Sequence, residues 1–176
     1  MRTPGLMLGY FDAPDLTREI IDDDGWLHTG DRGEIDAEGR LRITGRVKEL
    51  FKTSKGKYVA PAPIETRLLA HAQIKQACVS GGSMPQPYVL VVLSKAAREA
   101  PNDTIDRELA AILEELNASL DPHERLETMV VTSESWTVEN GLLTPTMKLK
   151  RNAIEERYAP FVKRWYASEE VVVRAG

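Results

Sequence analysis

Two apolar runs near the middle of the chain, residues 74–80 and 88–94, constrain its fold most strongly. Each is the length of a strand, and the turn sequence Gly-Gly-Ser-Met-Pro begins the segment between them, so the runs predict neighbouring strands of one sheet. A helix from Asn102 or Asp103 to Leu120 is predicted next. Its apolar residues recur at helical spacing, at Ile105, Leu109, Ile112, Leu113 and Leu116.

The remaining pattern completes an α+β domain over residues 48–176. Residues 61–72 predict a helix with proline near its start, residues 126–132 predict a strand, and residues 150–158 begin the last helical region. The order β-α-β-β-α-β-α after residue 48 predicts a small, largely antiparallel sheet flanked by helices.

Residues 1–47 have a different character. They predict a strand at residues 5–11, then a helix and a hairpin, which is too little chain to bury a convincing core. We therefore expect them to be a strand and hairpin remnant of a large N-terminal domain whose beginning precedes residue 1.

Composition excludes several classes of function. The net charge of −4 argues against a nucleic-acid partner, and the longest apolar runs are too short for a transmembrane segment. The single cysteine, Cys78, is expected to be a small buried hydrophobe. His28, His71 and His123 are scattered, so no metal site is predicted. A cytoplasmic location, or one peripheral to a membrane, is expected.

Two residues could bind a nucleotide. Asp31 follows a glycine in His-Thr-Gly-Asp, and its two carboxylate oxygens could accept hydrogen bonds from the vicinal hydroxyls of a ribose. The alternative is an aspartate that only caps a turn. Arg46 offers a rigid fork of donors for a phosphate or a hydroxyl pair, unless it is simply a solvated basic strand end.

Three further features concern lysines. Lys48 lies where the sequence pattern changes, so it is a candidate hinge. Lys52, Lys55, Gly56 and Lys57 form a loop that could cradle a phosphate or could be an ordinary charged hairpin tip.

Lys148 ends the loop Thr-Pro-Thr-Met-Lys. A lysine on a mobile loop can neutralise two anions that must approach each other, such as a carboxylate and the α-phosphate of ATP. Lys150 and Arg151, which follow it, are expected to be solvated positions at the start of a helix.

Taken together and in this order, these motifs resemble the adenylate-forming superfamily. DGWLHTGDRGEIDAEGRLRITGRVKELFKTSKGKYVAPAPIE, residues 24–65, is similar to its motif region. TPTMKLKRN is similar to its C-terminal lysine motif, and GLMLGYFDAPDLTREII to the segment that precedes TGD. The details GKYVAP and TVENGLLTPTMKLKR most resemble long-chain fatty acyl-CoA synthetases.

The resemblance implies a ligase that uses ATP, Mg²⁺ and CoA in two steps. A fatty acid attacks ATP to give acyl-adenylate and pyrophosphate, and the CoA thiol then releases AMP. Asp31 would hold the ribose hydroxyls, and Arg46 would assist at the ribose and phosphate. Lys48 would be the hinge of a rotating C-terminal domain, and Lys148 the adenylation lysine. The loop Lys55–Lys57 would help to admit CoA.

Two departures from the family pattern matter. Many members have glycine before the lysine, where this chain has Met147, although the long-chain branch often carries a bulkier residue there. The phosphate loop, adenine pocket, Mg²⁺ ligands and acyl tunnel are expected in the missing N-terminal domain. We therefore expect the chain alone not to catalyse the overall reaction. A carrier-protein or other acceptor, and a non-catalytic nucleotide-binding or interaction module, are the alternatives.

Overall fold

The computed structural model describes residues 1–175 and divides the chain into two compact units, Met1–Lys48 and Glu49–Gly176. The first unit contains α1 (Pro14–Ile20) and the antiparallel hairpin β1 (Asp31–Ile35) and β2 (Leu41–Arg46). Residues 5–11 form no strand, so that part of the prediction is wrong. Most apolar side chains of this unit are exposed, and none of the described ones belongs to a hydrophobic core.

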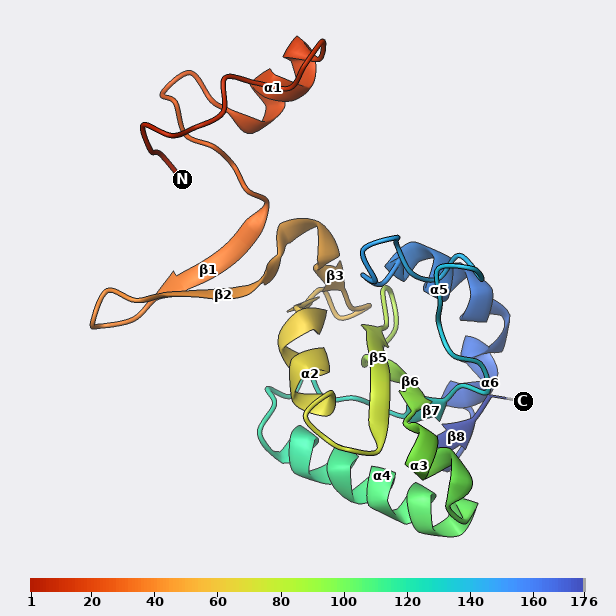
Figure 1. Ribbon diagram of the computed structural model, residues 1–176. Helices are drawn as coiled ribbons and strands as arrows, with labels where there is room; N and C mark the ends of the chain where they lie inside the picture. Colours follow the sequence, from red (N-terminus) through yellow and green to blue (C-terminus); the bar gives the residue numbers. More distant parts are fainter. Residues whose placement is uncertain (176) are drawn as a thin grey trace. The chain divides into compact units, whose positions relative to one another are not determined.

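The second unit begins with a short hairpin and continues into a four-stranded sheet with helices (Figure 1). Its hairpin strands are β3 (Phe51–Lys52) and β4 (Tyr58–Val59). The sheet strands are β5 (Ile74–Ser80), β6 (Tyr88–Leu93), β7 (Met129–Val131) and β8 (Val172–Arg174). The helices are α2 (Pro61–Leu68), α3 (Lys95–Glu99), α4 (Asn102–Ala118), α5 (Arg151–Tyr158) and α6 (Val162–Tyr166). The 3₁₀ helix η2 (Ala159–Phe161) joins α5 to α6.

The α+β class is confirmed, with one difference in strand direction. The sheet order is β5-β6-β7-β8, and β5 and β6 are antiparallel as predicted. β7 runs parallel to both β6 and β8. The physical reason is connectivity: α3 and α4 lie between β6 and β7, and α5 and α6 between β7 and β8, which gives the chain room to cross over.

The sheet has a hydrophobic core on each face. Because side chains alternate along a strand, Val79, Val89 and Val91 face the core that α2 and α4 cover. Their neighbours Cys78 and Leu90 face the other core, which α5 and α6 cover. The predicted apolar stripe of α4 is buried at all five positions, Ile105, Leu109, Ile112, Leu113 and Leu116.

Candidate functional site

Asp31 and Arg46 lie opposite each other at one end of the first unit's hairpin. The antiparallel register pairs the two residues, and Arg46 Nε is 3.2 Å from Asp31 Oδ1. Positive φ at Gly30 (74°) lets the chain turn into β1. The carboxylates that bond turn amides here belong to Asp22 and Asp36, whereas the Asp31 carboxylate pairs with a guanidinium. The pair therefore presents hydroxyl acceptors and phosphate donors side by side.

Lys48 lies in the 3₁₀ helix η1 (Val47–Glu49), at the boundary between the two units. Its side chain is exposed. The hinge role of Lys48 stays a prediction.

The predicted lysine loop is the tip of the β3–β4 hairpin. Lys55 and Lys57 are exposed there, and Lys52 Nζ lies 5.7 Å from the centre of the Tyr58 ring. The hairpin is also fixed from outside. The N–H of Ser54 donates to the C=O of Met84 (2.9 Å), and the N–H of Ser83 donates to the C=O of Lys52 (2.9 Å). The loop thus carries three ammonium groups on a backbone held by the β5–β6 turn.

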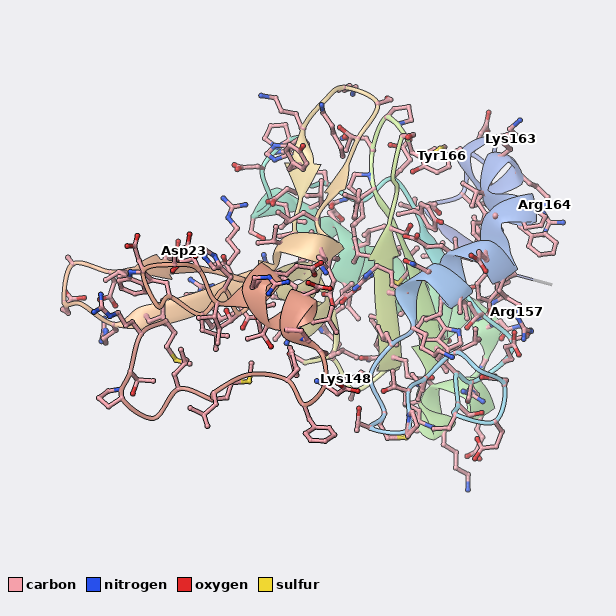
Figure 2. The ribbon with its side chains drawn as sticks, turned by 90° about the horizontal axis from the view of Figure 1, so that it is seen from above. Asp23, Lys148, Arg157, Lys163, Arg164 and Tyr166 are labelled. Carbon is pink, nitrogen blue, oxygen red and sulfur yellow. The ribbon has the colours of Figure 1, made fainter. Side chains whose placement is uncertain are left out.

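Lys148 lies at the end of the loop that precedes α5, where Figure 2 labels it. The buried Leu142 and Leu143 anchor the chain before the loop, and a single bridge pairs Leu143 with Leu149 after it. The N–H of Thr144 donates to the C=O of Lys148 (2.8 Å), while Thr144 Oγ1 accepts from the N–H of Lys148 (3.1 Å). These hydrogen bonds hold the backbone of the loop, although the Lys148 side chain is exposed.

The Lys148 loop repeats a hydrogen-bond pattern found elsewhere in the chain. In each loop of five residues, the N–H of the first residue donates to the C=O of the fifth. The N–H of the fourth residue donates to the C=O of the first. A side-chain oxygen of the first residue accepts from the fifth N–H. These loops span residues 22–26, 36–40, 53–57 and 144–148.

The fourth residue of every such loop has positive φ, as expected where a tight turn ends in a left-handed residue. Three of them are glycines, Gly25, Gly39 and Gly56, with φ between 77° and 80°. In the remaining loop, residues 144–148, this residue is Met147, with φ of 62°. Met147 stands where the family pattern has glycine, and it adopts the same left-handed backbone conformation beside Lys148.

Arg151 is not the solvated residue that the sequence suggested. Its guanidinium forms a buried two-pronged pair with Glu65, with Nη1–Oε1 at 2.8 Å and Nη2–Oε2 at 3.1 Å. Burial alone would lower the pKa of Arg151, but the hydrogen bonds to Glu65 and the negative charges around the guanidinium together outweigh burial and raise the pKa. Nη1 also donates to the sulfur of Cys78 (3.3 Å). Cys78 is buried as predicted, and burial raises its pKa to about 12.

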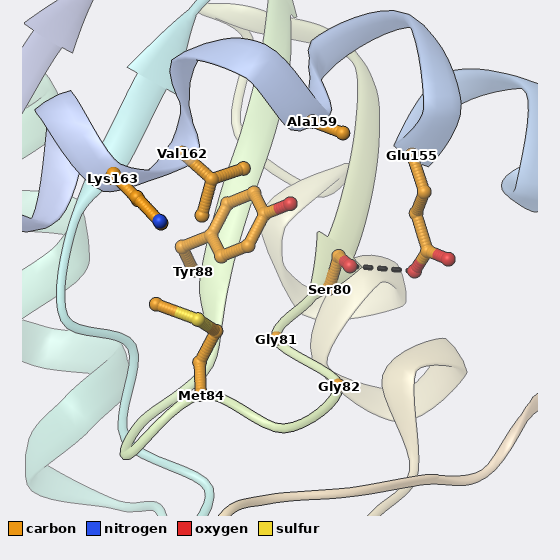
Figure 3. A pocket seen from close by; sticks show the side chains of 9 residues that line it. All are labelled: Ser80, Gly81, Gly82, Met84, Tyr88, Glu155, Ala159, Val162 and Lys163. Atoms are coloured by element: carbon orange, nitrogen blue, oxygen red, sulfur yellow. Dashed lines mark hydrogen bonds between the residues drawn. The ribbon is translucent and has the colours of Figure 1, made fainter.

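A pocket of about 320 Å³ lies between the β5–β6 turn and the α5–α6 region (Figure 3). Its walls are largely apolar, with Met84, Tyr88 and Val162 among them. Lys163 and the hydrogen-bonded pair Ser80–Glu155 (2.5 Å) supply its polar groups. Sequence reasoning missed this pocket because its walls come from segments about 70 residues apart in the chain.

Within residues 1–175, no group of three or more His, Cys, Asp or Glu side chains is placed to hold a metal ion. Over the same residues, no helix combines the length and the apolar character needed to span a bilayer.

Comparison with known proteins gives relatives over nearly the whole chain. Long-chain-fatty-acid–CoA ligase 6 of Homo sapiens is 34% identical over 95% of this chain and 26% of its own length. Peroxisomal long chain acyl-CoA synthetase 6 of Arabidopsis thaliana is 36% identical over 94% of this chain and 26% of its own. The chain therefore spans about a quarter of the length of these relatives.

Solved structures and a family model agree with these matches. The adenylation domain of a carboxylate reductase from Mycobacterium chelonae has a TM-score of 0.78 and 28% identity, over 92% of this chain and 26% of its own. That of a carboxylic acid reductase from Segniliparus rugosus, in complex with AMP and a co-purified carboxylic acid, has a TM-score of 0.79 and 25% identity, over 94% of this chain and 27% of its own. The model of the AMP-binding enzyme C-terminal domain matches residues 49–170. This chain therefore belongs to the AMP-binding enzyme C-terminal domain family of the adenylate-forming enzymes.

Proposed function

We propose that this chain is the C-terminal part of an ATP-dependent long-chain fatty acid–CoA ligase. The observation that carries the proposal is the exposed Lys148, held on a closed loop in a chain whose relatives are named as such ligases. The rest of the protein, which those longer relatives contain, would supply the acyl and adenine sites.

In the first step, the carboxylate oxygen of the fatty acid attacks the α-phosphorus of ATP. A new P–O bond forms, the bond to the β-phosphate breaks, and pyrophosphate leaves. Both reacting groups are anions, so the Lys148 ammonium would lower the barrier by neutralising charge as they approach. Asp31 would accept hydrogen bonds from the ribose hydroxyls, and Arg46, 3.2 Å from it, would orient that carboxylate and approach the phosphate.

In the second step, the CoA sulfur attacks the acyl carbonyl. A C–S bond forms, the C–O bond to AMP breaks, and the thiol proton passes to solvent or a base. Lys148 has no role in this chemistry, so it would be withdrawn by rotation about Lys48. The ammonium groups of Lys52, Lys55 and Lys57, with the Gly56 turn between them, suit the phosphates that CoA carries.

Mg²⁺ would accompany ATP, with its ligands in the rest of the protein. A cytoplasmic or membrane-peripheral location is part of the proposal. It is supported by the unpaired, buried thiol of Cys78, which is typical of a reducing compartment.

A second candidate differs only in the acceptor. One matching structure is the A-PCP didomain of a carboxylic acid reductase, 25% identical to this chain, which favours a carrier-protein thiol as the alternative. A non-catalytic nucleotide-binding or interaction module is the third possibility. The retention of Asp31, Arg46 and Lys148 together argues against it.

The test is an acceptor assay on the complete protein. AMP and thioester formation would be measured with ATP, Mg²⁺ and a panel of fatty acids, with free CoA or a phosphopantetheinylated carrier protein as acceptor. The proposal predicts CoA-dependent acyl-CoA formation with long-chain acids, and none from residues 1–176 alone. Thioester formation on the carrier but not on CoA would favour the second candidate. A complete protein that binds AMP but releases no pyrophosphate would support the third.

A further inference from the structure

The buried pair of Arg151 and Glu65 closes a gap at the edge of the sheet. β5 is an edge strand, so one row of its backbone groups has no strand partner. At Val79 side chains replace that partner. The Val79 N–H donates to Glu65 Oε1 (2.7 Å), and the Val79 C=O accepts from Arg151 Nη1 (2.8 Å). Helix α2, strand β5 and helix α5 are thereby joined at one point.

That point is also the base of the Lys148 loop. Arg151 is the first residue of α5 and follows Lys148 by three positions. One turn later Glu155, on the same face of the helix, accepts from Ser80 Oγ (2.5 Å). On the incoming side, the N–H of Lys150 donates to the C=O of Leu142 (2.9 Å). The loop therefore leaves from a buried segment and returns to one.

We propose that Arg151 is a positioning residue for Lys148, with Glu65 as its fixed anchor. The pair sets where α5 begins on the edge of β5, and so where the Lys148 ammonium lies during the adenylation step. This inference rests on the proposed role of Lys148. It adds to that role two residues whose side chains are only 14% and 10% exposed.

The geometry argues for positioning more than for stability. A buried ion pair contributes little net stability, because removing two charges from water offsets their attraction. This guanidinium instead meets Glu65 and Val79 at once, which fixes both distance and orientation. Lysine has one ammonium and cannot reproduce this set of bonds. A displacement of about 1 Å at a reacting group can cost about a hundredfold in rate.

The experiment uses the complete protein with Arg151→Lys, Glu65→Gln and a matched control, Arg157→Lys. Arg157 lies on the same helix and pairs with Glu134 at the surface (2.8 Å). Two half-reactions are compared at equal folded fraction: pyrophosphate release from ATP and fatty acid, and acyl-CoA formation from supplied acyl-adenylate and CoA. We expect kcat of the first to fall about tenfold to a hundredfold in both pair variants. The second half-reaction, the KM for ATP and the control should stay within about twofold of wild type.

A second measurement covers variants that fold poorly. The double variant Arg151→Met with Glu65→Leu removes both charges, so it avoids an unpaired buried ion. Positioning predicts that this double variant does not recover the adenylation rate, whatever its thermal stability. In the double variant, the Thr144 amide should exchange its hydrogen faster than in wild type, while amide exchange in β6 should stay unchanged. Recovery of the adenylation rate along with stability would overturn the inference, since the pair would then be structural only.

Lys148→Ala, measured in parallel, separates the two proposals. If it leaves pyrophosphate release intact, the proposed function of Lys148 fails and this inference fails with it. If it abolishes pyrophosphate release while Arg151→Lys and Glu65→Gln match wild type, only the positioning role is overturned.

Discussion

Met147 provides a test of backbone strain at the proposed catalytic loop. Its φ of 62° lies in the left-handed region, where the three equivalent loops have glycine. A side chain in that region costs roughly 1–2 kcal/mol. The Met147 side chain is 68% exposed, so its removal loses little burial.

Met147→Gly is therefore expected to stabilise the second unit. Relief of about 1–2 kcal/mol is offset by about 0.5–1 kcal/mol, which glycine costs through the greater freedom of the unfolded chain. The net gain is about 0.5–1 kcal/mol, or roughly 2–4 °C in melting temperature for a domain of this size. Urea denaturation followed by circular dichroism would measure it.

The reverse substitution in an equivalent loop is the matched control. Gly56→Met places a side chain at φ of 79° in the same hydrogen-bond pattern. A Cβ built there meets only Lys52 Cε, at an ordinary 3.7 Å, so strain is the main change. We expect a loss of about 0.5–1 kcal/mol. A destabilising Met147→Gly, or effects of the same sign in both variants, would refute the reasoning.

Three other predictions concern the core, the thiol and the nucleotide. Leu113→Ala, at a fully buried position of α4, should cost about 2–5 kcal/mol in urea denaturation, whereas the half-exposed Leu69→Ala should cost under about 1 kcal/mol. Because burial raises the pKa of Cys78 to about 12, a thiol reagent at pH 8 should label it only after denaturation. The unfolded thiol loses its proton first as pH rises, so Cys78 should lower the free energy of unfolding above about pH 9, and Cys78→Ala should reduce that pH dependence. Asp31→Asn in the complete protein should raise the KM for ATP roughly tenfold or more, and an unchanged KM would remove Asp31 from the ribose site.

The sequence predicted what periodicity and short motifs control. The α4 stripe, the antiparallel β5–β6 pair and the family could all be inferred from it, and the family is confirmed by the match over residues 49–170. The parallel direction of β7 and β8 could not be inferred, because such short apolar runs do not determine which strands they pair with or in which direction. β8, three residues long, was not predicted at all.

The site shows the same division. Asp31 and Arg46 are cross-strand partners, because they lie on the two paired strands of one predicted hairpin. Arg151 was misjudged because its partner Glu65 is 86 residues away, and the neighbouring Lys150 suggested a solvated charged run. The absent glycine at position 147 was visible in the sequence, but the structure was needed to show that the backbone keeps the left-handed turn. The roles of these residues stay predictions.

The most direct test of the central claim is the effect of Lys148→Ala on the two half-reactions of the complete protein. Lys150→Ala, at an exposed position two residues later, is the matched control. If the Lys148 ammonium neutralises the two reacting anions, Lys148→Ala should lower pyrophosphate release by at least about a hundredfold. Acyl-CoA formation from supplied acyl-adenylate should stay within about twofold of wild type, and Lys150→Ala should change neither step. Pyrophosphate release at the wild-type rate in Lys148→Ala would contradict the account.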